Sequence, residues 1–170
     1  MAGLVGYGCT GTLYIGDGDM IEVSMNTPAW DITDLTPLWA QFDVRGQDRR
    51  LPGTNGVIPY RRRFDVTTHE LPIVIIGGAD ENGTPNSDGW VGLEDNINTL
   101  RQYVIDPPNP PGSTGQHAAR LVMPSGQERF ANIHVLGLRV SEAQGTDDGL
   151  NAFMLGSLNI SIPRGVFVPA

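Results

Sequence analysis

The chain has 170 residues, of which 39% are hydrophobic and only 18% charged, and its net charge is −8. This length fits a single domain with a core of its own, and this composition excludes a wholly disordered chain. The acidic balance also excludes general affinity for duplex DNA, which requires a basic face.

Several broad classes are set aside by what the chain lacks. Cys9 is the only cysteine, so neither an intrachain disulfide nor a cysteine metal site is expected. No stretch approaches ~18 consecutive apolar residues, so we expect no transmembrane span and no membrane partner. The first residues, MAGLVGYGCTG, lack the basic start and the long apolar run of a signal peptide, so we expect synthesis in the cytoplasm.

The first part of the chain predicts short strands and turns, in keeping with 22 Gly and 13 Pro. Thr12–Ile15 and Met20–Met25 are apolar stretches on either side of a tight acidic turn. Asn26–Trp39, NTPAWDITDLTPLW, is interpreted as an extended or capped segment that is anchored to the core. The anchors are its large apolar side chains, Trp30, Leu35, Leu38 and Trp39.

The middle of the chain predicts two strands, a polar loop and the single helix. Arg61–His69 alternates as a half-buried strand, and Leu71–Ile76 is a β-branched run typical of a strand covered on both faces. After the loop Gly77–Gly89, a helix is predicted over about 92–105, because apolar residues recur at helical spacing. These are Leu93, Ile97, Leu100 and Val104.

The last third predicts a hairpin and a final strand. Ala119–Met123 and Phe130–Val140 are strands joined by a turn, and Met154–Ile162 alternates cleanly. The chain thus holds roughly eight short strands, with sheets before and after one helix. The predicted fold is mainly β: two packed antiparallel sheets, a β-sandwich or small barrel, with one flanking α-helix and long loops. We expect a single domain, 1–170, with an N-terminal arm at 1–11 and long loops at 45–60 and 141–151.

No motif predicts catalysis, a cofactor or a metal. Gly6–Gly11 matches G-x-G-x-x-G, but it lacks the preceding strand and following helix that dinucleotide binding needs. The three histidines lie far apart in the sequence, the acidic turns lack Ca²⁺-loop spacing, and no G-x-S-x-G or H-E-x-x-H occurs. We therefore predict that the protein is not an enzyme, with no catalytic, cofactor-binding or metal-ligating residue.

One stretch, residues 45–63 (RGQDRRLPGTNGVIPYRRR), carries a charge of +5, whereas the rest of the chain carries −13. A phosphate site, a solvated loop and an assembly contact are the three interpretations. Only Tyr60 and Phe64 could supply the stacking that nucleic-acid sites combine with charge. A basic loop on an acidic body is electrostatically complementary between copies, which favours a head-to-tail contact that closes into a ring.

Four segments together resemble tail proteins of long-tailed, siphovirus-type phages, especially those of actinobacteria. They are NTPAW…DLTPLW, R-G-x-x-R-x-L-P-G-x-x-G (Arg45–Gly56), R-R-R-x-D-V-T (Arg61–Thr67) and G-L-x-x-N-x-x-x-L (Gly92–Leu100). The resemblance covers about half of the chain. It implies the tail-tube fold, with hexameric rings that stack into a tube through which DNA passes without specific binding. It also implies a place in the virion among other tail proteins, after synthesis in the host cytoplasm.

On this hypothesis the basic residues belong at subunit and ring interfaces, against acids of a neighbouring copy. The candidate interface residues are Arg45, Arg49, Arg50, Arg61, Arg62 and Arg63. A distal or minor tail protein, which forms a single ring at the tail tip, is the alternative within the same class. A β-sandwich carbohydrate-binding module is the alternative from another class, in which Trp30, Trp39 and Trp90 would contact the glycan.

Overall fold

The computed structural model describes residues 11–16, 22–39, 44–45, 49–50, 57–58, 63–64, 66–104, 116–145, 152–165 and 167–169. The predicted mainly β fold with one helix is confirmed. The helices are the 3₁₀ helix η1 (Thr36–Trp39) and the α-helix α1 (Gly89–Val104). The strands are β1 (Thr12–Gly16), β2 (Val23–Ser24), β3 (Trp30–Ile32), β4 (Val44–Arg45), β5 (Arg49–Arg50), β6 (Val57–Ile58), β7 (Arg63–Phe64), β8 (Thr67–Ile76), β9 (His117–Val122), β10 (Glu128–Val140), β11 (Phe153–Ile162) and β12 (Val168–Pro169).

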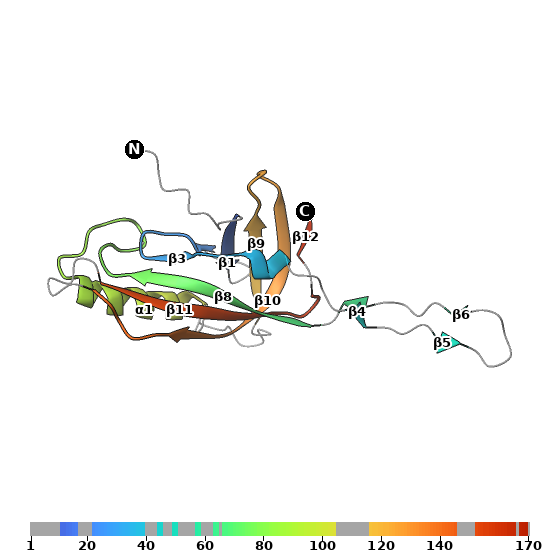
Figure 1. Ribbon diagram of the computed structural model, residues 1–170. Coiled ribbons are helices and arrows are strands. Elements are labelled where there is room, and N and C mark those ends of the chain that lie inside the picture. Colours follow the sequence, from blue (N-terminus) through green and yellow to red (C-terminus); the bar gives the residue numbers. More distant parts are fainter. Residues whose placement is uncertain are drawn as a thin grey trace, which may run out of the picture.

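The predicted two sheets are the two halves of one curled antiparallel sheet (Figure 1). Its strand order is β2-β1-β9-β10-β11-β8-β3, and β12 pairs with β10. The long strand β10 belongs to both halves, because Glu128–Ile133 pairs with β9 and His134–Val140 pairs with β11. Its register shifts between Val135 and Gly137. An irregularity of this kind bends a strand, which suits a strand that passes from one layer to the other.

The two ends of the strand order approach each other through the segment after β2. The Met25 N–H donates to the Leu13 carbonyl at 2.8 Å, and the Ile32 N–H donates to the Met25 carbonyl at 3.0 Å. Asn26 forms a bridge with Asp31 of β3. The sheet therefore nearly closes on itself, which is the barrel-like form of the predicted sandwich.

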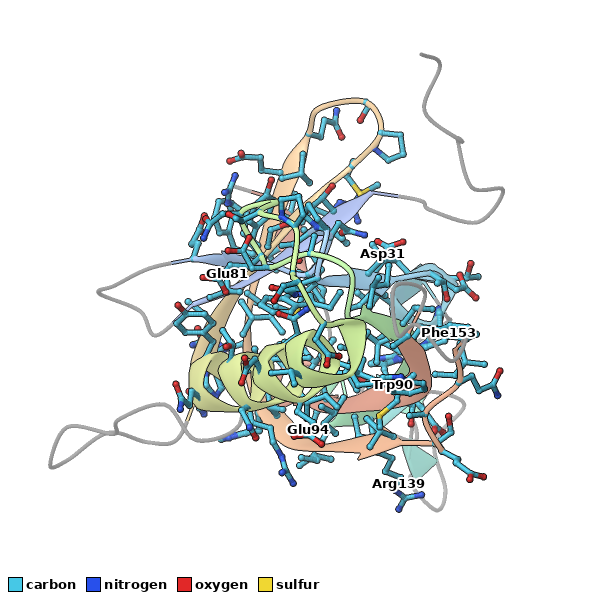
Figure 2. The ribbon with its side chains drawn as sticks, turned by 90° about the vertical axis from the view of Figure 1, so that its left-hand side faces the viewer. Asp31, Glu81, Trp90, Glu94, Arg139 and Phe153 are labelled. Carbon is cyan, nitrogen blue, oxygen red and sulfur yellow. The ribbon has the colours of Figure 1, made fainter. Side chains whose placement is uncertain are left out.

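The core fills the curled sheet beneath α1, which lies across its near side in Figure 2. In β8, Leu71, Ile73 and Ile75 point inward and are buried, as alternation requires. The expectation that this run is covered on both faces is wrong, since Val74 is half-buried and Ile76 is 36% exposed. The outward face of the strand carries apolar side chains that are only partly covered.

The ends of β8 and α1 are joined at close range. The Asn96 side-chain amide, buried on the helix, donates to the Ile76 and Ala79 carbonyls at 2.6 and 2.8 Å. The helix begins at Gly89, before the predicted start near 92, because the Asp88 carboxylate accepts hydrogen bonds from the Trp90 and Val91 N–H groups at 2.8 and 3.3 Å. Such a cap satisfies N–H groups that have no partner within the helix.

The predicted loops hold more structure than expected. The stretch 45–60 is not only loop, because Arg45 lies in β4, Arg49–Arg50 forms β5 and Val57–Ile58 forms β6. At the start of the predicted loop 141–151, Gln144 pairs with Phe153. Residues 1–10 of the predicted arm and residues 146–151 lie outside the described residues. No helix in the described part of the chain is long and apolar enough to cross a membrane.

Candidate assembly surfaces

The arginine-rich stretch contributes two antiparallel strand pairs, β4–β7 and β5–β6, which we call the basic ribbon. Figure 1 places the labelled strands of the basic ribbon beyond one end of the curled sheet. Of the six candidate interface residues, Arg45, Arg49, Arg50 and Arg63 lie in these strands. Arg61 and Arg62 lie outside the described residues. Sequence reasoning expected a loop here because Leu51–Gly56 is rich in turn residues.

The register of the basic ribbon places two arginines directly opposite each other. Arg45 pairs with Arg63, whereas Arg49 and Arg50 pair with Ile58 and Val57. Like charges at directly opposite positions of an antiparallel pair destabilise it. A carboxylate beside such a pair would reduce this repulsion.

The opposite end of the molecule is acidic. We call the segment Gly77–Leu100, the loop after β8 and most of α1, the acidic end: it holds five acids and no basic residue. The five are Asp80, Glu81, Asp88, Glu94 and Asp95. β8 runs from the basic ribbon to the acidic end, and its ten residues span about 30 Å at ~3.3 Å per residue (Figure 1).

Three of these acids accept hydrogen bonds within the chain: Asp80, Asp88 and Glu81, the last from the Tyr103 hydroxyl. The Asp80 carboxylate accepts hydrogen bonds from the Thr84 and Asn82 N–H groups at 2.7 and 2.9 Å, and the bond from Thr84 is the main cause that lowers the pKa of Asp80. Asp88 caps α1. Glu94 and Asp95 are exposed on the helix. The acidic end therefore presents negative charge at neutral pH.

At the junction of β1, β9 and β10, one arginine is neutralised within the chain. Arg120 of β9 forms ion pairs with Glu22 and, at 2.8 Å, with Glu128, and its guanidinium lies 4.3 Å from the centre of the Tyr14 ring. The hydrogen bond to Glu22 is the main cause that raises the pKa of Arg120. Because these residues are far apart in sequence, sequence reasoning did not find the cluster. Arg120 fastens β1, β2, β9 and β10 together and has little charge to offer a partner.

The structure removes one of the three tryptophans from a role in glycan contact. Trp30 is fully buried, and its indole N–H donates to the Ser24 carbonyl at 3.0 Å. Trp30 is thus a core anchor, as the sequence predicted, and is closed to a glycan. Trp90 at the start of α1 is 37% exposed, and the side chain of Trp39 lies outside the described structure.

Within the described part of the chain, no three His, Cys, Asp or Glu side chains gather where they could hold a metal ion. His69 and His117 are buried in different strands, β8 and β9. The described acids accept hydrogen bonds in turns, in the cap of α1, in ion pairs and from the side chains of Asn26 and Tyr103. The arrangement of charge can support complementary contact between molecules.

Of the comparisons with known proteins, the one with solved structures gives a match. No protein-family model matches the chain, and no curated protein matches it. Among solved structures, the chain is similar to the Dit protein of phage SPP1, described as a paradigm of the hub adsorption apparatus in phages that infect Gram-positive bacteria. The match has a TM-score of 0.50 at 13% sequence identity and covers 90% of this chain and 50% of that one. The chain thus spans about half the length of SPP1 Dit, and at this identity what the two proteins share is a fold.

Proposed function

We propose that this protein is a structural component of the tail of a long-tailed phage and acts by self-assembly. The observation that carries the proposal is the fold shared over 90% of the chain with SPP1 Dit, a protein of a phage hub adsorption apparatus. The four sequence segments that resemble phage tail proteins point the same way independently. On this proposal the protein resides in the virion, binds other tail proteins and has no catalytic role.

The charge distribution supports contact between copies. The basic ribbon and the acidic end lie at opposite ends of the molecule (Figure 1), so one copy's ribbon can meet the acidic end of the next. A contact between two different surfaces of identical subunits generates a ring when its rotation closes. We propose a hexameric ring, with the candidate interface residues Arg45, Arg49, Arg50, Arg61, Arg62 and Arg63 against carboxylates of the neighbour.

The outer face of the sheet offers further support. Ile76 pairs with Phe153 and Val74 with Leu155, so these four apolar residues share the outward face of β8 and β11. Ile76 is 36% and Leu155 is 47% exposed. Adjacent exposed apolar side chains on a sheet favour coverage by another protein surface.

In the full form of the proposal, rings stack into a tube and DNA passes through the lumen without specific binding. The net charge of −8 suits this role, because a negative channel repels phosphate and lets the genome slide. A single ring at the tail tip is the second candidate, and the match to a hub protein favours it. Tube and ring differ in whether assembly continues beyond one ring.

Electron microscopy of the purified protein, negatively stained, tests the proposal. We expect six-fold rings; long tubes would identify the tube protein, and single rings the distal one. A protein that stays monomeric at all salt and protein concentrations would contradict self-assembly.

The double variant Arg49→Glu/Arg50→Glu tests the basic ribbon. We expect it to block assembly and to leave the circular dichroism spectrum unchanged, because the ribbon lies outside the core. Arg139→Glu/Arg164→Glu is the matched control, since it makes the same change in net charge at exposed residues outside both the ribbon and α1. Normal rings from the Arg49→Glu/Arg50→Glu variant, or an equal loss of assembly in this variant and the control, would rule out the basic ribbon as the contact.

A further inference from the structure

We propose that a hollow beside Glu81 and Tyr103 receives an arginine side chain from the basic ribbon of a second copy of this chain. The inference rests on the proposed self-assembly and adds the surface that the ribbon meets. Three segments that are far apart in sequence form the hollow: residues 22–30 around β2, the loop after β8, and the last turn of α1. Its volume is about 190 Å³, and its lining residues are Glu22, Val23, Ser24, Thr27, Trp30, Glu81, Asn82 and Tyr103.

One carboxylate oxygen at this hollow is left without a partner. The Tyr103 hydroxyl donates to Oε1 of Glu81 at 3.3 Å. Oε2 of Glu81 is enclosed and accepts no hydrogen bond from any described residue. An enclosed carboxylate oxygen without a donor is costly, and a guanidinium is the protein group best matched to a carboxylate, through paired, charge-assisted hydrogen bonds.

The surroundings of Glu81, and not only its carboxylate, favour a guanidinium. The Tyr103 ring is 39% exposed, and arginine stacks on aromatic faces. The negative charge of Glu81 is the main cause that raises the pKa of the Tyr103 hydroxyl, which places the ring in a negative field. Glu22, the other carboxylate at the hollow, is already paired with Arg120, whereas Glu81 forms no ion pair with a described residue.

Neither Arg120 nor the basic ribbon of the same chain supplies this arginine. Arg120, which lies close to the hollow through Glu22, is engaged by Glu22 and Glu128. The basic ribbon of the same chain lies at the far end of β8, about 30 Å away by the length of that strand. Figure 2 looks at the acidic end, where Glu81 and Glu94 lie on either side of α1, whereas the ribbon lies beyond the other end of the sheet in Figure 1.

The position of the hollow explains why the ribbon would find it. The acidic end attracts a basic segment at long range. Glu81 and Tyr103 then provide a specific binding site, which we call the arginine site. The ribbon in turn carries Arg45 opposite Arg63, a pair that gains from carboxylate contact. Since the chain has no lysine, arginine is the only side chain that a second copy could offer as a permanent cation.

Titration of the full-length protein with a synthetic peptide tests the arginine site. The probe is a fluorescently labelled peptide of residues 45–63, and its binding is measured by fluorescence anisotropy. The test variants are Glu81→Gln and Tyr103→Ala. Glu94→Gln is the control, because it removes one negative charge elsewhere, on α1. We expect Glu81→Gln to weaken binding by about tenfold or more, the effect of losing a charged hydrogen-bond partner, and Tyr103→Ala to weaken it too. Glu94→Gln should stay within about twofold of the wild type, since an exposed charge contributes little.

Equal weakening by Glu81→Gln and Glu94→Gln would mean that only the general field of the acidic end acts, and would overturn the proposal. Absence of binding to the wild type would overturn it as well, and so would equal binding of a peptide with all six arginines replaced by glutamine. Electron microscopy of the same proteins separates the two hypotheses. If Glu81→Gln forms normal rings, the arginine site is contradicted and self-assembly stands. If the wild type never assembles, the self-assembly hypothesis is contradicted.

Discussion

His69 is a titratable side chain that the fold keeps away from water. It lies in β8, is 8% exposed, and its Nε2 is 3.0 Å from the Thr67 hydroxyl oxygen. Burial lowers the pKa of the imidazole, and a hydrogen bond with the backbone of Pro37 in η1 acts in the opposite direction to a smaller extent. The folded protein therefore favours neutral His69.

This shift predicts a loss of stability in mild acid. The unfolded chain takes up a proton on His69 near pH ~6.5, whereas the folded chain resists protonation until lower pH. The stabilising contribution is thus complete above pH ~6.5 and is lost as pH falls toward the folded pKa. Urea unfolding between pH 7.5 and 5 should show a steeper decline for the wild type than for His69→Gln. Parallel curves for the two proteins would show that another group controls the decline.

At the residue scale, sequence patterns predicted the apolar anchors better than the polar ones. Trp30, Leu35 and Leu38 were predicted as anchors, and all three are buried. The buried Asn96 was missed, because helical periodicity was judged on apolar residues alone. Its signal was present, since it falls on the same helical face as Leu93 and Leu100. A polar residue on an apolar face indicates a backbone partner, here the carbonyls at the end of β8.

The contact between α1 and the end of β8 is a close junction between elements. A Cβ added at Gly92 would overlap the Gly77 carbonyl oxygen and the Asn86 side-chain amide, which are themselves joined by a hydrogen bond of 2.8 Å. A Cβ at Gly77 would overlap the carbonyl of Gly89. Glycine at these positions lets the helix backbone approach the strand end closely.

Gly92→Ala should therefore destabilise the protein although alanine favours helices. Overpacking against backbone atoms typically costs about 1–3 kcal/mol, more than the gain in helix propensity. The free energy of unfolding in urea measures the effect. Asn98→Ala, an exposed substitution on the same helix, should stay within about 0.5 kcal/mol of the wild type. Wild-type stability in Gly92→Ala would mean that the junction is looser than the structure shows.

At the element scale, elements defined by a local sequence pattern could be predicted, whereas elements defined by non-local strand pairing could not. The hairpin of β9 and β10, the strand β11 and the helix follow from alternation and periodicity within single segments. The basic ribbon was predicted as a loop, because its strands are two residues each and its centre is rich in Gly and Pro. Pairing Arg45 with Arg63 joins residues 18 positions apart and leaves no local signature.

At the scale of the whole molecule, the separation of charge was only half visible in the sequence. The clustering of arginine at 45–63 could be counted directly. The acidic end could not be placed opposite it without knowing that β8 runs between them. The hollow was beyond sequence reasoning altogether, since Glu22, Glu81 and Tyr103 come from three distant segments. Which surfaces face each other is a property of topology, and topology was predicted only as a class.

The charge separation predicts that salt weakens self-assembly. Contacts between exposed arginines and carboxylates are screened as the Debye length falls from ~8 Å at 0.15 M to ~3 Å at 1 M salt. The assembled fraction, measured by analytical ultracentrifugation, should fall as NaCl rises over this range. The free energy of unfolding of the subunit should change much less, because its core is apolar. Assembly that strengthens with salt would instead assign the contact to apolar surface, with the outward face of β8 and β11 as the first candidate.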